Sequence, residues 1–330
     1  MSDTPSQSEF RAESRAADKL ARRLYAAGCR YAFGMPGGEV LTIVDALERA
    51  GIRFVLAKHE NAAGFMAEGV HHTDGAPAIL VATVGPGALN CVNVTANAEQ
   101  DRVPMIVLTG CVDSDEELTY THQILDHQAV YRPITRATFK LTADSADIVA
   151  DKAVSIAMTP RCGPVHIDVP ISVADAVRPD RVTPETVPTG PVAPTGTALS
   201  KAREWLAGAE RPIAIIGLDV LRDGSDTVLR AFLEHFSIPF ITTYKAKGVL
   251  REDHPLCLGA AGLSPKADTQ LMPLGEQAGL ILARGDDPIE MSTRWRNPWG
   301  PPKQKAIGNT ALPKTPPHHP ATMELLGGTG

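Results

Sequence analysis

The sequence lacks the features of several common protein classes. Of its 330 residues, 32 are Lys or Arg and 38 are Asp or Glu, so the net charge is −6 and no long basic block occurs. A nucleic-acid partner is therefore not expected, because such proteins gather Lys and Arg in one patch. No apolar run approaches the roughly 18 residues of a membrane span, and the polar, acidic start does not resemble a signal peptide. We expect a cytoplasmic protein with no membrane partner.

Cysteine is sparse and has no pattern. The five cysteines are scattered without a C-x-x-C pair, and the neighbouring His71 and His72 do not share a helix face. A disulfide framework or a metal site is therefore not expected, and the cysteines are predicted to be core thiols. The G-x-G-x-x-G fingerprint is also missing from both Gly-Pro turns, "FGMPGG" (33–38) and "TVGPGALN" (83–90), which argues against a nicotinamide dinucleotide site.

Short apolar runs alternate with helical patterns over two stretches of the chain. The first stretch contains "YAFG", "IRFVLA", "AILVATV", "PMIVLTG" and "GPVHIDV", and the second contains "PIAIIG", "PFITT" and "AGLILARG". Apolar runs separated by helices are typical of parallel sheets that helices cover on both faces. The prediction is an α/β protein with two doubly wound, mostly parallel-sheet, three-layer domains joined by an extended linker.

Changes in composition predict the domain boundaries. The first domain is expected at 12–177, and a Pro-, Thr- and Val-rich linker at 178–197. A central Rossmann-like domain is expected at 198–299. Six of the last 30 residues are Pro and no periodicity is visible there, so residues 300–330 are predicted to be a disordered tail, and residues 1–11 a disordered N-terminus.

Three predicted strand ends carry unusual residues. They are the two Gly-Pro turns and Glu60, which follows a strand and opens a helix. Open parallel sheets bind ligands at the carboxyl ends of their strands, and glycine lets the backbone approach a ligand closely. Taken alone, Glu60 is also typical of a first helical turn, where the helix dipole favours a carboxylate. Asn93 and Asn97 share a face with Asn90, and the pattern is equally typical of a wet or interface surface.

Several segments of the sequence resemble those of a known enzyme family. "FGMPGGEVLTIVDAL", "HENAAGFMAEG", "TVGPGALN" and "DRVPMIVLTG" resemble, in order and spacing, the N-terminal pyrimidine-binding domain of thiamine diphosphate enzymes of the acetolactate synthase-like superfamily. "RPIAIIG", "PFITTYKAKGVLREDHPLCLG" and "LILARGDDPIEM" are similar to the central domain of that family. The resemblance extends to about residue 299.

The resemblance implies a set of site residues. Glu60 would hydrogen-bond a pyrimidine ring nitrogen of thiamine diphosphate and so activate the cofactor, because a buried carboxyl group can exchange a proton with the ring. The pyrimidine slot would be lined by Pro36, Gly37, Thr83, Pro86 and Asn90. "THQILDHQ" is similar to the loop that places a glutamine beside the cofactor, which is Gln123. His122 is either a substrate-side acid or an exposed loop histidine, and both His122 and Cys111 depart from the usual family pattern.

The implied activity is decarboxylation of a small-molecule 2-keto acid, with ligation of the product to an aldehyde or ketone. In the family a third domain holds the diphosphate through Mg²⁺ with a Gly-Asp-Gly motif, which this sequence does not contain. We therefore expect only the pyrimidine half of the site here, with Mg²⁺ held by a missing domain. The family's central domain sometimes carries FAD, for which this sequence shows no supporting glycines.

Two hypotheses follow for the chain. One is a truncated or frame-shifted enzyme, ending near residue 300, that is inactive alone and completes its site as a homodimer or with a chain that carries the diphosphate-binding domain. The alternative is a catalytically inactive two-domain remnant that acts only in dimerisation or interaction.

Overall fold

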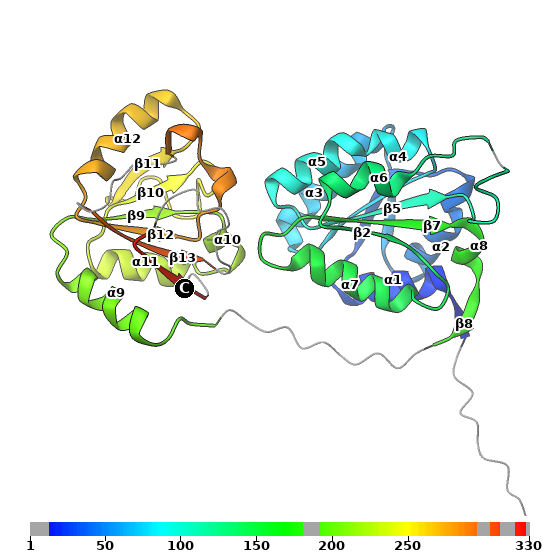
Figure 1. The fold of residues 1–330 in the computed structure, drawn as a ribbon, viewed down its shortest axis with the longest axis horizontal. Helices are drawn as coiled ribbons and strands as arrows, with labels where there is room; N and C mark the ends of the chain where they lie inside the picture. Colours follow the sequence, from blue (N-terminus) through cyan, green and yellow to red (C-terminus); the bar gives the residue numbers. More distant parts are fainter. Residues whose placement is uncertain (1–12, 120, 181–191, 296–303, 311–320, 328–330) are drawn as a thin grey trace, which may run out of the picture. The chain divides into compact units, whose positions relative to one another are not determined.

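Two α/β units make up the chain. The computed structural model describes residues 13–119, 121–180, 192–295, 304–310 and 321–327. The units are residues 1–186 and 187–330, and each contains a six-stranded parallel sheet between helices (Figure 1). The predicted fold class is thereby confirmed for both units. Most of the predicted linker lies outside the described residues, and two of its residues, Arg178 and Pro179, instead belong to a short strand.

The first unit contains eight strands and eight α-helices among its described residues. The strands are β1 (Glu13–Arg15), β2 (Tyr31–Met35), β3 (Arg53–Leu56), β4 (Ala78–Ala82), β5 (Met105–Cys111), β6 (Ala137–Lys140), β7 (Pro164–Pro170) and β8 (Val177–Pro179). The helices are α1 (Ala16–Ala26), α2 (Leu41–Arg49), α3 (Glu60–Asp74), α4 (Pro86–Asn90), α5 (Val92–Asp101), α6 (His127–Tyr131), α7 (Ala146–Met158) and α8 (Ile171–Asp175). The parallel sheet has the order β3-β2-β4-β5-β7-β6, and β1 pairs with β8 in an antiparallel ribbon.

Helices cover both faces of this sheet. One core packs α1, α2, α7 and α8 against it, with Leu20 and Ile43 among the buried side chains. The other core packs α3, α4, α5 and α6 against the opposite face, around Val94 and Tyr131 (Figure 1). Every residue of β4, β5 and β7 is buried. This double coverage explains why the central strands have continuous apolar runs.

The strand order places a switch point between β2 and β4. The chain leaves β2 toward β3 on one side, then crosses over and continues from β4 toward β5 on the other side. The loops at the carboxyl ends of β2 and β4 therefore lead away in opposite directions, and this is the edge of the sheet where doubly wound folds bind ligands. The two Gly-Pro turns follow these two strands.

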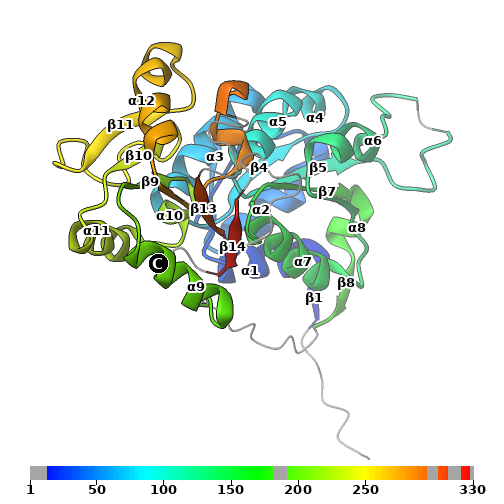
Figure 2. The ribbon, with the colours of Figure 1, turned by 60° about the vertical axis from the view of Figure 1, so that its left-hand side comes forward.

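The second unit repeats the architecture. Its strands are β9 (Pro212–Ile216), β10 (Phe240–Thr243), β11 (Cys257–Ala261), β12 (Leu280–Arg284), β13 (Lys305–Thr310) and β14 (Met323–Leu326), in the order β11-β10-β9-β12-β13-β14. Its α-helices are α9 (Thr197–Ala207), α10 (Asp219–Arg222), α11 (Asp226–His235) and α12 (Pro265–Gln277). The core with α9, α10 and α11 lies on one face of the sheet and that with α12 on the other, as a turned view shows (Figure 2).

Strands β13 and β14 correct the predicted tail. Disorder over 300–330 is wrong for residues 305–310 and 323–326, because β13 pairs with β12 and β14 pairs with β13. The predicted end of the central domain at residue 299 is also too early. Strand β13 lies between β12 and β14, but its sequence contains Lys305, Gly308 and Asn309 and so lacks a continuous apolar run. Strand β14 is a four-residue edge strand that depends on β13 for its pairing. Residues 300–303, 311–320 and 328–330, and residues 1–11, lie outside the described residues.

Candidate functional site

Glu60 is a buried carboxylate at the start of a helix. It is the first residue of α3, and it is only 4% exposed. The preceding residue, His59, already caps the helix, because its ring accepts a hydrogen bond from the backbone N–H of Asn61 at 3.1 Å. The carboxylate of Glu60 is therefore not needed as the cap, although it gains from the positive end of the helix dipole.

The structure brings Glu60 together with Asn90 and Gly87. Asn90 Nδ2 donates a hydrogen bond to Glu60 Oε2 at 3.0 Å. A Cβ atom placed on Gly87 would lie 3.3 Å from Glu60 Oε1 and 2.6 Å from Thr83 Cγ2, so α4 approaches the carboxylate with no side chain between. Within the described residues Oε1 accepts no hydrogen bond, and this oxygen remains available to a ligand.

The turn after β2 and the turn after β4 meet at the switch point. Thr83 Oγ1 donates to Glu39 Oε2 at 2.5 Å, and a Cβ atom on Gly37 would lie 2.6 Å from the same hydroxyl oxygen. Only glycine fits at position 37 without a shift of Thr83. Pro36 is half-buried beside it. The predicted residues of the first turn therefore lie against those of the second.

Pro86 and the 112–126 loop complete the surroundings of the second turn. Pro86 is the exposed first residue of α4. Gln123 has φ +59° and its backbone oxygen would lie 2.8 Å from a Cβ atom on Gly85, so its backbone packs over the turn while its side chain is exposed. His122 lies next to it in the same exposed loop.

The asparagine face joins two helices. Asn93 Nδ2 donates to Asn61 Oδ1 at 3.1 Å, and Asn97 Nδ2 donates to Glu68 Oε2 at 3.4 Å. Together with the bond from Asn90 to Glu60, these contacts connect α4 and α5 with α3. The polar stripe thus fixes the position of the helix that carries the buried carboxylate.

Sequence reasoning missed a buried polar network behind the second turn, and it missed Glu39. The network, which we call the His127 network, consists of Thr109, His127, Tyr131, His166 and Asp168. A signal was present in the sequence, because Thr, His and Asp interrupt the apolar strands "PMIVLTG" and "GPVHIDV". Buried polar residues need partners, so such interruptions point to a network.

The corresponding switch point of the second unit holds a different carboxyl group. Glu290 is fully buried, and its two oxygens accept from the backbone N–H of Leu218 at 3.1 and 3.0 Å, while Oε1 also accepts from that of Asp287 at 2.6 Å. The Thr243 hydroxyl is a further partner. Burial raises the pKa of Glu290 to about 8. These backbone N–H groups at the ends of β9 and β12 are therefore bonded within the unit.

The part of the chain that the structure describes contains neither a metal-binding cluster nor a membrane-spanning helix. There, no group of three or more His, Cys, Asp or Glu residues is arranged to hold a metal ion. None of the helices described has the length and apolarity needed to cross a membrane.

The two turns that meet beside Glu60 form what we call the corner. Together with the fold, the corner defines a class of protein, the doubly wound α/β proteins that bind a ligand at the switch point. Residues 14–130 match the family described as "Thiamine pyrophosphate enzyme, N-terminal TPP binding domain", and residues 199–327 match "Thiamine pyrophosphate enzyme, central domain". The chain belongs to the thiamine pyrophosphate enzyme family. The resemblance stated from the sequence is thereby confirmed, and the second match includes β13 and β14.

Similar proteins are described as acetolactate synthases. The chain is 34% identical over 260 residues to a probable acetolactate synthase large subunit of Methanocaldococcus jannaschii, which covers 75% of this chain and 43% of the relative. It is 34% identical over 254 residues to the acetolactate synthase large subunit of Corynebacterium glutamicum, covering 75% and 40%. It is 32% identical over 292 residues to the acetolactate synthase of Bacillus subtilis, covering 86% and 50%. The alignments span half or less of the length of these relatives.

Proposed function

We propose that this chain supplies the pyrimidine half of a thiamine diphosphate site, with Glu60 as the group that activates the cofactor, in a protein that decarboxylates a 2-keto acid. The observation that carries the proposal is the buried Glu60 carboxylate with one oxygen bonded to Asn90 and the other unbonded. The family membership and the acetolactate synthase relatives support it. Ligation of the product to an acceptor is part of the same proposal.

The corner has the properties that an aminopyrimidine ring requires. The ring is flat, and the two turns meet with glycines at 37 and 87, beside the small side chain of Thr83. The free oxygen of Glu60 provides one strong hydrogen-bonding group in an otherwise buried setting. Pro36, Pro86 and Asn90 would line the same slot, and Gln123 would lie beside it. These residues fit the pyrimidine half of the cofactor.

In this mechanism Glu60 exchanges a proton with a pyrimidine ring nitrogen. Thiamine diphosphate, when bound, supplies a nucleophilic carbon and an electron sink for loss of carbon dioxide from the keto acid. Asn90 holds Glu60 Oε2, so the proton shared with the ligand is carried at Oε1. Burial of Glu60 excludes water that would compete for that proton, and fixed protein dipoles take the place of that water. His122 would act on the substrate side.

Association with a second chain is also part of the proposal. Large apolar side chains remain exposed on α3 and at the end of α4, among them Phe65, Met66 and Leu89. Exposed apolar groups on helices beside a ligand corner are typical of an interface. The partner would be a second copy or a chain that carries a diphosphate-binding domain, which would bring Mg²⁺. FAD in the central unit has no observation in its favour, because Glu290 takes the backbone donors at that switch point.

Calorimetry of the 330-residue chain tests this function. Thiamine diphosphate with Mg²⁺ is titrated into the wild-type chain and into Glu60→Gln, alone and with an added full-length acetolactate synthase large subunit. We expect binding to the wild-type chain that Glu60→Gln weakens at least tenfold, about 1.4 kcal/mol. The exposed Glu48→Gln is the matched control and should bind like wild type.

Two outcomes decide between the candidates. Pyruvate decarboxylation in the mixed sample that depends on Glu60 would support the enzyme. Absence of binding in every sample, together with association of the chains, would instead favour the interaction protein without chemistry.

A further inference from the structure

One short helix holds both ends of the turn that approaches Glu60. His127 Nε2, at the start of α6, accepts a hydrogen bond from the backbone N–H of Gly85 at 3.0 Å. One helical turn later, the hydroxyl of Tyr131 donates to the backbone oxygen of Ala88 at 2.6 Å. His127 is 2% exposed and Tyr131 is fully buried. The segment 85–90 is thus fixed to α6 at two points, one of them the N–H of Gly85, the residue that precedes α4.

The contacts determine where the proton of His127 is held. Its Nδ1 lies 2.8 Å from Asp168 Oδ1, which also accepts a bond from the Thr109 hydroxyl at 2.6 Å. A carboxylate oxygen pairs with an N–H, so Nδ1 carries the hydrogen. Nε2 faces the N–H of Gly85 and must be bare. Only the neutral ring with its proton on Nδ1 satisfies both partners.

The contacts also determine where the other hydrogens of the network are held. Burial lowers the pKa of His166 to about 4, so this ring is neutral near pH 7. The single hydrogen of Thr109 is used on Asp168, so His166 Nε2, at 2.8 Å, donates to Thr109 Oγ1. The remaining nitrogen of His166, Nδ1, is buried and has no hydrogen-bond partner within the described residues. Each donor therefore has one acceptor along the whole path from His166 to Gly85.

We propose that His127 is a positioning residue that holds the 85–90 turn against Glu60, and that protonation of its Nε2 releases the turn and weakens binding of the cofactor pyrimidine. The inference rests on the proposed function. A second N–H on the ring would point at the N–H of Gly85, which would lose its acceptor in a buried place. The turn carries Gly87 and Asn90, the two neighbours of the Glu60 carboxylate, so its release alters both sides of that carboxylate.

A cavity connects this network with the surface. It has a volume of about 460 Å³, and it is lined by His127 and Asp168 and also by exposed residues such as Glu117 and Gln123. The ionisable groups that contact His127 or share this cavity are Cys111, Glu117, Asp126, Tyr131, Arg132, Lys140, His166 and Asp168.

Two of these groups, Cys111 and Tyr131, stay uncharged near neutral pH. Burial raises the pKa of Cys111 to about 12 and raises that of Tyr131 well above its ordinary value. Lys140 forms an ion pair with Glu117. Histidine is the side chain that ordinarily changes charge between pH 5 and 8, and His166 is removed from that range. His127 is the other histidine of the network.

The first test needs no ligand. The 330-residue chain is labelled with ¹⁵N, and long-range ¹⁵N–¹H NMR of the imidazole is combined with amide hydrogen exchange. At pH 8 we expect a hydrogen on Nδ1 of His127, none on Nε2, and protected amides over 85–90. Lower pH should protonate Nε2 and raise the exchange of Gly85 beyond the intrinsic pH effect. A hydrogen on Nε2 at pH 8, or exchange that His127→Ala leaves unchanged, would overturn the positioning role.

The second test adds ligand and a conservative rescue. Binding of thiamine diphosphate with Mg²⁺ is followed by amide shift titration at pH 6 and pH 8. We expect wild-type affinity to fall about tenfold at pH 6. His127→Gln, whose amide oxygen still accepts the N–H of Gly85 but does not titrate, should bind equally at both values. His72→Gln, an exposed histidine of the same unit, is the control and should keep the wild-type pH dependence.

The outcomes separate the two proposals. Wild-type binding that is equal at pH 6 and pH 8, while the exchange of Gly85 changes, would reject the coupling between His127 and the cofactor. Absence of binding at both values would reject the proposed function, and the coupling with it, whereas the exchange data would still decide whether His127 holds the turn.

Discussion

At the scale of single residues, the corner depends on missing side chains as much as on the carboxylate. Gly37 and Gly87 are both so close to Thr83 that a Cβ atom would come within 2.6 Å of it. Contacts this short require a shift of the neighbour, and Thr83 is held by its bond to Glu39. The two turns can therefore meet beside Glu60 only because these positions are glycine.

The first prediction concerns Gly87. Its replacement by Ala should push α4 away from Thr83 and Glu60, and we expect binding of thiamine diphosphate to weaken at least tenfold in the calorimetric assay. Gly69→Ala is the matched control, because Gly69 lies in α3 with open space around it. That variant should bind normally and gain about 0.5–1 kcal/mol in free energy of unfolding, since Ala favours helix. Normal binding by Gly87→Ala would contradict the role assigned to the close approach.

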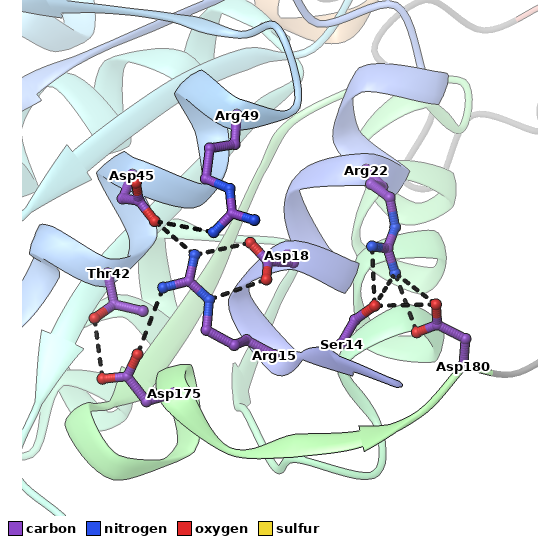
Figure 3. Close-up of polar contacts among 9 residues, drawn as sticks. All are labelled: Ser14, Arg15, Asp18, Arg22, Thr42, Asp45, Arg49, Asp175 and Asp180. Atoms are coloured by element: carbon purple, nitrogen blue, oxygen red, sulfur yellow. Dashed lines mark hydrogen bonds and ion pairs between the residues drawn. The ribbon is translucent and has the colours of Figure 1, made fainter. Parts of the chain in front are cut away.

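At the scale of elements, an ion-pair cluster fixes the start of the first unit. Arg15 in β1 forms a two-bond contact with Asp18 in α1 at 2.9 Å and an ion pair with Asp45 in α2 at 2.5 Å (Figure 3). It also reaches Asp175 of α8 at 3.7 Å, and Thr42 donates to that carboxylate. One guanidinium thus connects the β1–β8 ribbon with three helices, and planar two-bond geometry makes such contacts stronger than single pairs.

The second prediction uses this cluster. Arg15→Leu should lower the free energy of unfolding of the first unit by about 1–3 kcal/mol, while Arg49→Leu, which removes a mostly exposed pair to Asp45, should change it by about 0.5 kcal/mol or less. Arg15 lowers the pKa of Asp18. The contribution of this ion pair to stability is therefore complete above the ordinary pKa of an aspartate, near 3.8, and is lost as pH falls through the lowered pKa. Urea unfolding at pH 7 and pH 3 should show a smaller difference between wild type and Arg15→Leu at pH 3.

The elements also show what the sequence could and could not reveal. The central strands β4, β5, β9 and β12 were readable because burial on both faces requires continuous apolar residues. The edge strands β6 and β14 were not, because short strands at an edge depend on a neighbour for pairing, and β13 was not, because Lys305, Gly308 and Asn309 interrupt its apolar pattern. The strand ends drew attention to Glu60, and the family resemblance to Asn90, and the structure places these two side chains in contact. The His127 network could not, because residues 109, 127, 166 and 168 meet only in the folded unit.

At the scale of the whole molecule, each unit has its own cores. The buried clusters of the first unit and those of the second share no residue. The second unit also has acids with raised pKa values, about 8 for the buried Glu290 and about 6 for the partly buried Asp219, in both cases chiefly because of desolvation. A raised pKa means that the folded state binds a proton more tightly than the unfolded state. The stabilising effect of this proton is complete below the ordinary pKa of the acid and is lost as pH rises through the pKa in the folded state.

The last prediction follows for unfolding of the 330-residue chain. All three tryptophans, Trp205, Trp295 and Trp299, belong to the second unit, so their fluorescence reports on that unit. We expect the urea midpoint seen by fluorescence to fall as pH rises from 5 to 8, because ionised Glu290 is costly when buried. Glu290→Gln should remove most of this dependence, whereas the exposed Glu252→Gln should keep it. Amide hydrogen exchange in β4 and β5, which reports on the first unit, should be the same in Glu290→Gln as in the wild-type chain. If it did, the two units would unfold as one, and the separate cores would not mean separate stability.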